Sequence, residues 1–364
     1  MAGCYQWQVR CRERGACCTL MRADGMAAAA AFIVHYLNDT GVKRAVLLLA
    51  ESARMVTGPS CLSEGNNMKT MKLKPVALLI AGLAAVSSVV QAQTLDKILE
   101  TNRITVSYRE AAVPFSYRPG QGKAVGFAVD LTEAIVGDVR TRLNRPGLVV
   151  AYMPVSAQDR IPLLVNGSYD LECGSTTNNA ARGKVVAFAI SHFYAGTRLL
   201  VKTGSKVRNY ADLAGQTVAT TAGSTNEKVM RKYSADHKLD VQFVLAKDYA
   251  ESLALLENNR AAALALDDIL LFGLRANAKD PAALSVVGDT LQVEPYGCML
   301  RKDDPEFKQL VDGAIARLMQ SGEFSRLYHK WFESPIPPNG VVLNMPMSDR
   351  LKANLKALSD QPEQ

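Results

Sequence analysis

The 364-residue sequence has little histidine and lacks the short motifs that mark common catalytic sites. Of its four histidines, only His192, His237 and His329 follow residue 92, and none is expected in a loop at the end of a strand. No Gly-x-Ser-x-Gly, His-Glu-x-x-His or Gly-x-x-x-x-Gly-Lys-Ser/Thr motif is present. These are the signatures of serine hydrolases, zinc proteases and P-loop proteins. We therefore expect neither an enzyme nor a bound cofactor.

Cysteine is scarce in the body of the chain, and its spacing excludes a zinc site. Only Cys173 and Cys298 follow residue 67, and they can either form a disulfide or remain two buried thiols. The other five have no paired Cys-x-x-Cys and no matching histidine spacing; they are Cys4, Cys11, Cys17, Cys18 and Cys61.

Positive charge is also lacking where the chain is expected to fold. Residues 1–92 hold ten Lys and Arg against five Asp and Glu, which leaves 32 against 30 for residues 93–364 out of the totals of 42 and 35. The net charge of +7 therefore comes mostly from the first 92 residues. The rest of the chain has no basic surplus that would indicate a nucleic-acid partner.

The main apolar run, Pro75 to Val90, is shorter than the roughly 20 residues that a membrane-spanning helix needs. Three lysines precede it and Val90-Gln91-Ala92 ends it, which is typical of a secretory signal peptide at residues 68–92. We expect export to the periplasm and a mature chain that starts at Gln93. Residues 1–67 have no sustained period, and we expect them to be an over-extended reading frame outside the fold.

After residue 92 the pattern is α/β. Three expected strands, at residues 104–108, 148–153 and 169–173, each end in polar residues that precede or begin a helix. In open α/β sheets, ligands bind at the carboxyl ends of the strands. The loops after these strands are therefore the expected ligand site.

Two extended passages, near residues 193–198 and 290–296, indicate crossings between two lobes. The expected first lobe comprises residues 93–195 and 296–364, and the second comprises residues 196–295. Each lobe is expected to be α/β, with the ligand in the cleft between them.

The segment from Glu172 to Arg182 is a candidate carboxylate site. It offers Ser175 and Thr177 before a helix-like segment that carries Arg182. Hydroxyls and free N–H groups at a helix start attract an anion, and an arginine can bind both of its oxygens. The alternative is a Ser/Thr/Asn helix cap with a surface arginine.

Three arginines, Arg109, Arg160 and Arg182, follow expected strand ends in the first lobe. Converging cations repel one another unless an anion neutralises them, which favours a ligand with two carboxylates. In the second lobe Asp267 ends a strand and can accept a hydrogen bond from an ammonium group, while Thr225 repeats the anion site more weakly. The predicted ligand is an acidic amino acid.

At this point the sequence resembles the periplasmic amino-acid-binding proteins of ABC transporters, solute-binding protein family 3, and in particular its glutamate/aspartate-binding members. The similarity covers residues 94–360, and it is carried by residues 113–117, 160–164, 172–179, 196–200, 296–305 and 335–338. The resemblance implies a type II periplasmic-binding-protein fold with two lobes joined by a two-crossing hinge. It also implies a monomer that hands L-glutamate or L-aspartate to an inner-membrane ABC permease.

The resemblance assigns roles to single residues, and these are the site residues that we expect. It implies that Arg182 and Thr177 bind the α-carboxylate, Ser175 and Asp267 the α-ammonium, and Arg109 and Arg160 the side-chain carboxylate, with Thr225 closing from the second lobe. The chain departs from the family at Ala157, where relatives have a serine, and at Tyr249, where they have a histidine. We expect Tyr249 to be the eighth residue that binds the ligand. Both positions lie at the side-chain end of the site, so the sequence leaves open whether glutamate or aspartate is preferred.

Two kinds of rival remain open from the sequence. One is an enzyme on the same fold, such as a periplasmic dehydratase, which would need a carboxylate acid or base in the cleft. The other is a binding protein for a different amino acid, such as glutamine or asparagine.

Overall fold

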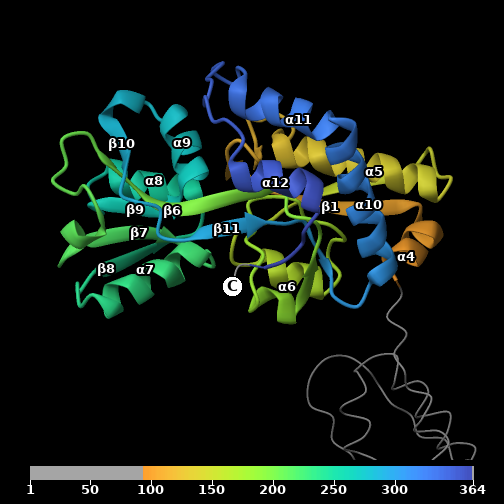
Figure 1. Cartoon of the computed structure of the whole chain (residues 1–364), viewed down its shortest axis with the longest axis horizontal. Helices are drawn as coiled ribbons and strands as arrows, with labels where there is room; N and C mark the ends of the chain where they lie inside the picture. Colours follow the sequence, from red (N-terminus) through yellow and green to blue (C-terminus); the bar gives the residue numbers. More distant parts are fainter. Residues whose placement is uncertain (1–92, 363–364) are drawn as a thin grey trace, which may run out of the picture. The chain divides into compact units, whose positions relative to one another are not determined.

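The computed structural model describes residues 93–362, drawn in colour in Figure 1. The expectations for residues 1–67 and for the signal peptide at residues 68–92 lie outside the described residues. The strands expected at residues 104–108 and 148–153 form within one residue of the expected bounds.

The first part of the chain builds a small parallel sheet with helices around it. Strand β1 (Arg103–Tyr108) pairs in parallel with β4 (Val149–Pro154), and helix α5 (Phe127–Arg142) connects them. Because the two strands are parallel, the loops that follow them lie at the same edge of the sheet. The remaining elements of this part are α4 (Thr94–Thr101), the hairpin of β2 (Ala111–Ala112) and β3 (Ser116–Tyr117), and α6 (Arg160–Val165).

The strand expected at residues 169–173 does not form as a regular strand. Leu171 makes only an isolated parallel bridge with Val106 of β1. The Thr105 N–H donates to the Asp170 carboxylate at 2.9 Å, so a side chain takes the place of a main-chain acceptor in the ladder. The segment lies beside β1 as expected, but the prediction of a regular strand was wrong.

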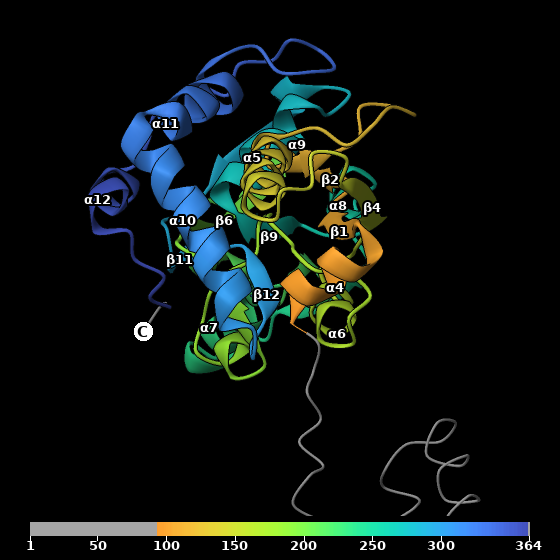
Figure 2. The ribbon, with the colours of Figure 1, turned by 90° about the vertical axis from the view of Figure 1, so that its right-hand side faces the viewer.

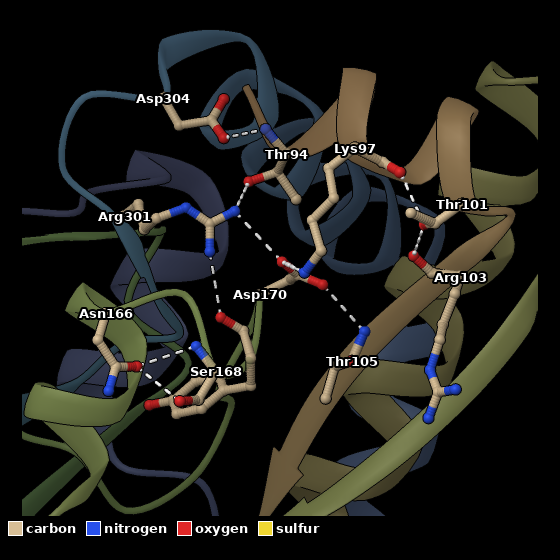
Figure 3. A network of polar contacts seen from close by, with 11 residues as sticks. Thr94, Lys97, Thr101, Arg103, Thr105, Asn166, Ser168, Asp170, Arg301 and Asp304 are labelled. Carbon is tan, nitrogen blue, oxygen red and sulfur yellow. Dashed lines mark hydrogen bonds and ion pairs between the residues drawn. The ribbon is translucent and has the colours of Figure 1, made fainter. Parts of the chain in front are cut away.

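Asp170 is the centre of the polar network in Figure 3, which fixes α4 to the body of the chain. Its fully buried carboxylate accepts from Lys97 at 2.8 Å and from Arg301 at 3.2 Å. The Thr94 N–H at the start of α4 donates to Asp304 at 2.7 Å. A buried carboxylate is stable only when such hydrogen-bond partners satisfy it. Because Lys97 and Thr94 belong to α4, these contacts hold the first helix after residue 93 in place.

The second part of the chain is a mixed sheet of six strands. The order is β10-β6-β9-β7-β8, and β11 also pairs with β6. Strand β9 and most of β7 are buried, and helices lie on both sides of the sheet (Figure 1). The strands are β6 (Phe193–Lys202), β7 (Thr217–Thr221), β8 (Gln242–Ala246), β9 (Ala263–Asp267), β10 (Leu284–Val287) and β11 (Val293–Tyr296). The helices are η2 (Tyr210–Leu213), α7 (Thr225–Asp236), α8 (Tyr249–Glu257), α9 (Asp268–Ala276) and η3 (Pro281–Ala283).

Strands β6 and β11 occupy the two passages that the sequence predicts to be extended. They pair antiparallel, with Tyr296 opposite Phe193. After β11 the chain continues as β12 (Met299–Arg301), which pairs with β5 (Val186–Phe188). The two passages therefore lie side by side and carry the chain into and out of the six-stranded sheet.

The last helices pack against the first part. Helix α10 (Pro305–Ser321) lies beside α5 in both Figure 1 and Figure 2, and it is followed by α11 (Glu323–Tyr328), the π-helical turn η4 (His329–Glu333) and α12 (Asp349–Ala357). The ring of Phe115 lies 4.9 Å from Phe193 and 5.3 Å from Tyr296. Since Phe193 and Tyr296 belong to the two crossing strands, aromatic packing anchors both strands to the first part of the chain.

Candidate functional site

The segment Glu172–Asn178 is buried and fixed from two sides. The Asn178 N–H donates to the Pro295 carbonyl of β11 at 2.8 Å. Cys173 and Cys298, which the sequence left open as a disulfide or two thiols, are joined by a disulfide across 125 residues of chain. The hydroxyl groups of this segment are therefore presented from a constrained backbone.

Arg160, the first residue of α6, lies buried under this segment. Its Nη1 donates to the Ser175 carbonyl at 3.2 Å and to the Thr176 hydroxyl. That hydroxyl donates in turn to Glu172 at 2.9 Å. The Nε of Arg160 is buried and has no hydrogen-bond partner among the described residues. Arg160 therefore supports the segment with one nitrogen and retains an unused donor.

Arg109, just after β1, packs on Tyr249. Its guanidinium carbon lies 4.8 Å from the centre of the Tyr249 ring, a cation–π contact. The Tyr249 hydroxyl lies 3.3 Å from the Ser175 hydroxyl. The Nη1 of Arg109 is buried without a hydrogen-bond partner in the described part of the chain. This contact sets Arg109 and Ser175 from the first part against Tyr249 at the start of α8.

Arg182 begins only a three-residue 3-10 turn, η1 (Arg182–Lys184), so the expected helix after this segment is wrong. Its Nη1 donates to the Thr177 carbonyl at 2.9 Å, and its Nη2 donates to the Gly223 carbonyl at 3.2 Å. Burial, followed by repulsion from Arg160, lowers the pKa of Arg182 to about 10. Arg182 is therefore still a cation at neutral pH.

Thr177 and Thr225 meet at a buried carboxylate that the sequence reasoning missed. Their hydroxyls lie 3.2 Å apart, and they donate to the same oxygen of Glu294, Oε2, at 2.6 Å and 2.5 Å. Glu294 is 1% exposed. Burial and repulsion from Asp267 raise the pKa of Glu294 to about 7.

Asp267, at the end of β9, is also buried. One of its oxygens accepts from Asn226 at 2.8 Å and the other accepts from the Tyr296 hydroxyl. Burial raises the pKa of Asp267. Arg182 and Arg160 act on it in the opposite direction, so Asp267 is within electrostatic reach of both arginines.

The eight expected site residues therefore gather in one region. Direct contacts link Arg109, Tyr249, Ser175 and Arg160, and a second set links Arg182, Thr177 and Thr225, while Asp267 is coupled electrostatically to two of the arginines.

Sequence reasoning missed the polar residues on the return crossing. Glu294 and Tyr296 are two positions apart on β11, and such residues point to the same face of a strand. The alternation of polar Glu294 and Tyr296 with Pro295 was the available signal.

The arginines are not the only charges here. Glu172, Asp267 and Glu294 are buried in the same region. The repulsion among the arginines, from which the sequence argued for a dicarboxylate, is therefore partly offset by carboxylates of the protein itself.

The two parts of the chain also meet closely at Gly223. A Cβ atom at this position would lie 2.7 Å from the Cα atom of Gln158 and 2.9 Å from the Ala157 carbonyl oxygen. Gly223 also has a φ of 78°, which favours glycine. Nearby, a cavity of about 260 Å³ opens beside Arg109; it is also lined by Glu110, Ala111, Pro154, Val155, Ser156, Asp159, Lys247 and Asp248.

Two further findings concern metal ligands and the apolar character of the helices. Within residues 93–362, no group of three or more His, Cys, Asp or Glu side chains is placed to hold a metal ion. None of the helices in this part combines the length and the apolar composition that crossing a membrane requires.

Known protein sequences are similar to this chain over most of its length. Residues 104–334 match the model of the bacterial extracellular solute-binding proteins, family 3. The chain is 44% identical over 299 residues to the glutamate/aspartate import solute-binding protein of Escherichia coli K12, covering 80% of this chain and 99% of that protein. It is also 44% identical over 297 residues to the L-glutamate/L-aspartate-binding protein of Pseudomonas aeruginosa PAO1, covering 80% and 98%.

Solved structures agree on the architecture. An ancestral arginine-binding protein bound to arginine superposes with a TM-score of 0.57 and 28% identity, covering 64% of this chain and 98% of that one. The sequence prediction of a type II periplasmic-binding-protein fold is therefore confirmed.

Proposed function

The chain belongs to the bacterial extracellular solute-binding proteins, family 3, and from this premise we propose that it captures L-glutamate or L-aspartate between its two lobes and delivers it to an ABC permease. Two relatives with 44% identity carry names that specify both amino acids. The observation that carries the proposal is the convergence of three arginines with a buried aspartate. Such a site offers donors for two carboxylates and an acceptor for one ammonium group.

In the proposed site, Arg182 and Thr177 bind the α-carboxylate, and Ser175 and Asp267 bind the α-ammonium. The contacts around Arg182 support its role, because its two terminal nitrogens donate to neutral carbonyl groups and, among residues 93–362, to no carboxylate. A carboxylate makes stronger, charge-assisted hydrogen bonds with a guanidinium than a carbonyl does.

The side-chain carboxylate belongs with Arg109 and Arg160 in this proposal. Both arginines have a buried nitrogen without a hydrogen-bond partner in the described residues, Nη1 of Arg109 and Nε of Arg160. A buried donor without a partner costs about 1–3 kcal/mol, and more when it is charged. A second carboxylate satisfies both nitrogens, whereas the neutral amide of glutamine or asparagine leaves the positive charge uncompensated.

The choice between glutamate and aspartate rests with Ala157 and Tyr249. Ala157 offers no hydroxyl donor, and the ring of Tyr249 covers the Arg109 guanidinium. We propose that these two residues, rather than the residues that bind the α-carboxylate and α-ammonium groups, set the preferred side-chain length.

Closure of the two lobes is the proposed mechanism. The lobes are residues 93–195 with 296–364, and residues 196–295, joined near residues 193–198 and 290–296. The hydrogen bonds that Thr177 and Thr225 both donate to Glu294, together with the Arg182–Gly223 hydrogen bond, join one lobe to the other. A ligand that contacts both lobes shifts the population toward the closed state. We further propose export to the periplasm by the segment at residues 68–92, and function as a monomer.

Thermal unfolding of the protein with each amino acid tests the proposal. A ligand at about 1,000 times its dissociation constant adds roughly 4 kcal/mol to the free energy of unfolding. We expect a higher Tm with L-glutamate and L-aspartate. No shift with glutamate, aspartate, glutamine or asparagine would contradict the assignment.

A further inference from the structure

Glu294 is a buried carboxylate at the junction of the two lobes; it contacts Thr177 and Thr225 of the site proposed above but has no role in that proposal. It lies on β11, one of the two crossing strands. Its Oε2 accepts from the hydroxyls of Thr177 and Thr225, and its Oε1 is buried without any hydrogen-bond partner in the described chain. A carboxylate with one unpartnered oxygen is a costly group to bury.

The hydrogen-bond partners of both carboxylates are neutral groups. Glu294 accepts from Thr177 and Thr225, and Asp267 accepts from Asn226 and Tyr296. The two carboxylates repel each other, as the rise in the pKa of Glu294 reflects. Two buried anions that raise each other's energy attract a small cation that can lie between them.

The geometry of strand β11 places Glu294 near Asp267. Glu294 and Tyr296 share one face of the strand, because residues two positions apart point to the same side. The Tyr296 hydroxyl donates to Asp267, so this face of β11 brings Glu294 toward Asp267. Thr177, assigned to the α-carboxylate, already touches Glu294.

We propose that Glu294 is a second acceptor for the α-ammonium group of the captured amino acid, beside Asp267. This inference rests on the proposed function. An ammonium group has three N–H donors. Ser175 and Asp267 account for two of them, and the unpartnered oxygen of Glu294 accepts the third.

The hydrogen-bond partners of Glu294 change when the amino acid binds. The hydroxyls of Thr177 and Thr225 now donate to Glu294. The α-carboxylate of the ligand takes the Thr177 hydroxyl, and the ammonium group compensates Glu294 for the lost hydrogen bond. Glu294 therefore selects for an amino acid over a simple dicarboxylic acid.

The test compares L-glutamate with glutarate, which has both carboxylates but no ammonium group. Dissociation constants are measured by calorimetry, or by competition at millimolar concentrations for glutarate, in the wild type, Glu294→Gln and the matched control Glu306→Gln. Glu306 is an exposed residue of α10. Removing a hydrogen bond to a charged group costs about 10- to 100-fold in affinity.

We expect Glu294→Gln to lose about 10- to 100-fold in affinity for L-glutamate and to keep or improve the affinity for glutarate. The control should match the wild type with both ligands. Equal losses for both ligands would mean that Glu294 is only structural, and an unchanged affinity for L-glutamate would also overturn the inference. Both of these outcomes leave the proposed function intact, whereas a wild type that binds no acidic amino acid refutes the function itself.

A measurement on the wild type decides the matter if Glu294→Gln does not fold. The affinity for L-glutamate should rise between pH 6 and pH 8, as Glu294 ionises, while the affinity for glutarate should stay level or fall. Asp267 of β9, Arg182 and Tyr296 of β11 interact electrostatically with Glu294. Four further charged or titratable groups, Lys228, Lys232, Tyr233 and Asp236 of α7, line the same cavity as Glu294. A parallel pH dependence for the two ligands would overturn the inference.

Discussion

Binding of L-glutamate should become tighter as the pH rises from 6 to 8. Burial and repulsion from Asp267 raise the pKa of Glu294 to about 7. The α-ammonium group binds the ionised form of Glu294, so the proton on Glu294 must leave before or during binding. Binding should therefore release protons near neutral pH.

The size of the effect follows from that pKa. With a pKa of about 7, about one molecule in ten has an ionised Glu294 at pH 6, and about nine in ten at pH 8. If only the ionised form binds, the apparent dissociation constant falls by about tenfold over this range, equivalent to roughly 1.4 kcal/mol.

His192 and Arg182 do not change charge in this range. His192 is buried, and burial lowers its pKa to about 4. Arg182, with a pKa of about 10, stays charged. Asp268, whose pKa burial raises to about 6, contacts Gly196 of the crossing strand β6, so Asp268→Asn is the control that removes its contribution.

Calorimetry in two buffers of different ionisation enthalpy measures the released protons directly. The wild type and Asp268→Asn should both release protons on binding L-glutamate near pH 7, and Glu294→Gln should not. Affinity that is level from pH 6 to pH 8, or proton release that persists in Glu294→Gln, would refute the reasoning.

The same pKa predicts how the protein without ligand responds to pH. The folded-state pKa of Glu294 is above its ordinary value of 4.5. The contribution of this group to stability is therefore fully present below about pH 4.5 and is lost as the pH rises through about 7. Glu294→Gln should accordingly raise the Tm at pH 8 more than at pH 5, and the reverse order in a pair of thermal melts would contradict the burial argument.

Three further predictions concern the rest of the site. Arg182→Ala should abolish binding of both acidic amino acids, whereas Arg109→Ala should relax selectivity toward neutral side chains; equal, mild losses in calorimetry would contradict the assigned roles. Replacing Cys173 and Cys298 together by serine should lower the free energy of unfolding by roughly 2–5 kcal/mol in denaturant melts, and an unchanged melt would show that the bond adds nothing. Gly223→Ala should weaken ligand binding by at least tenfold while the chain still folds, because its Cβ would lie 2.7 Å from the facing loop; wild-type affinity would show that the lobes need not approach this closely.

The alternation of strands and helices could be predicted because local patterns determine it. Helix α10, for example, begins after Asp304, whose carboxylate accepts from the Phe307 N–H at 3.2 Å, and ends at Gly322 in a left-handed conformation. Both signals are local in the sequence.

The missed features depend on contacts between distant residues. The strand expected at residues 169–173 does not form, because the Asp170 side chain accepts the hydrogen bond of the Thr105 N–H. The sequence of residues 169–173 alone does not indicate that Thr105 is the partner. The disulfide was left open because the partners are 125 residues apart.

The residues of the candidate site also divide into those that local sequence predicts and those that depend on distant contacts. The arginines after strand ends could be predicted, since parallel strands bring such loops to one edge. For Glu294 the only local signal was its alternation with Tyr296 along the expected extended passage; its burial could not be predicted, because it results from the pairing of two crossing strands and from the approach of Thr225 from the second lobe. A carboxylate in a short extended passage otherwise resembles any exposed residue of an edge strand.

Calorimetric titration of the wild-type protein with L-glutamate, L-aspartate, L-glutamine and L-asparagine tests the central claim most directly. The buried arginines predict that each acidic amino acid binds at least about tenfold more tightly than its amide, because the amide loses charge-assisted hydrogen bonds. Amides that bind as tightly as the acids, or no binding by any of the four, would contradict the proposal that this site captures acidic amino acids.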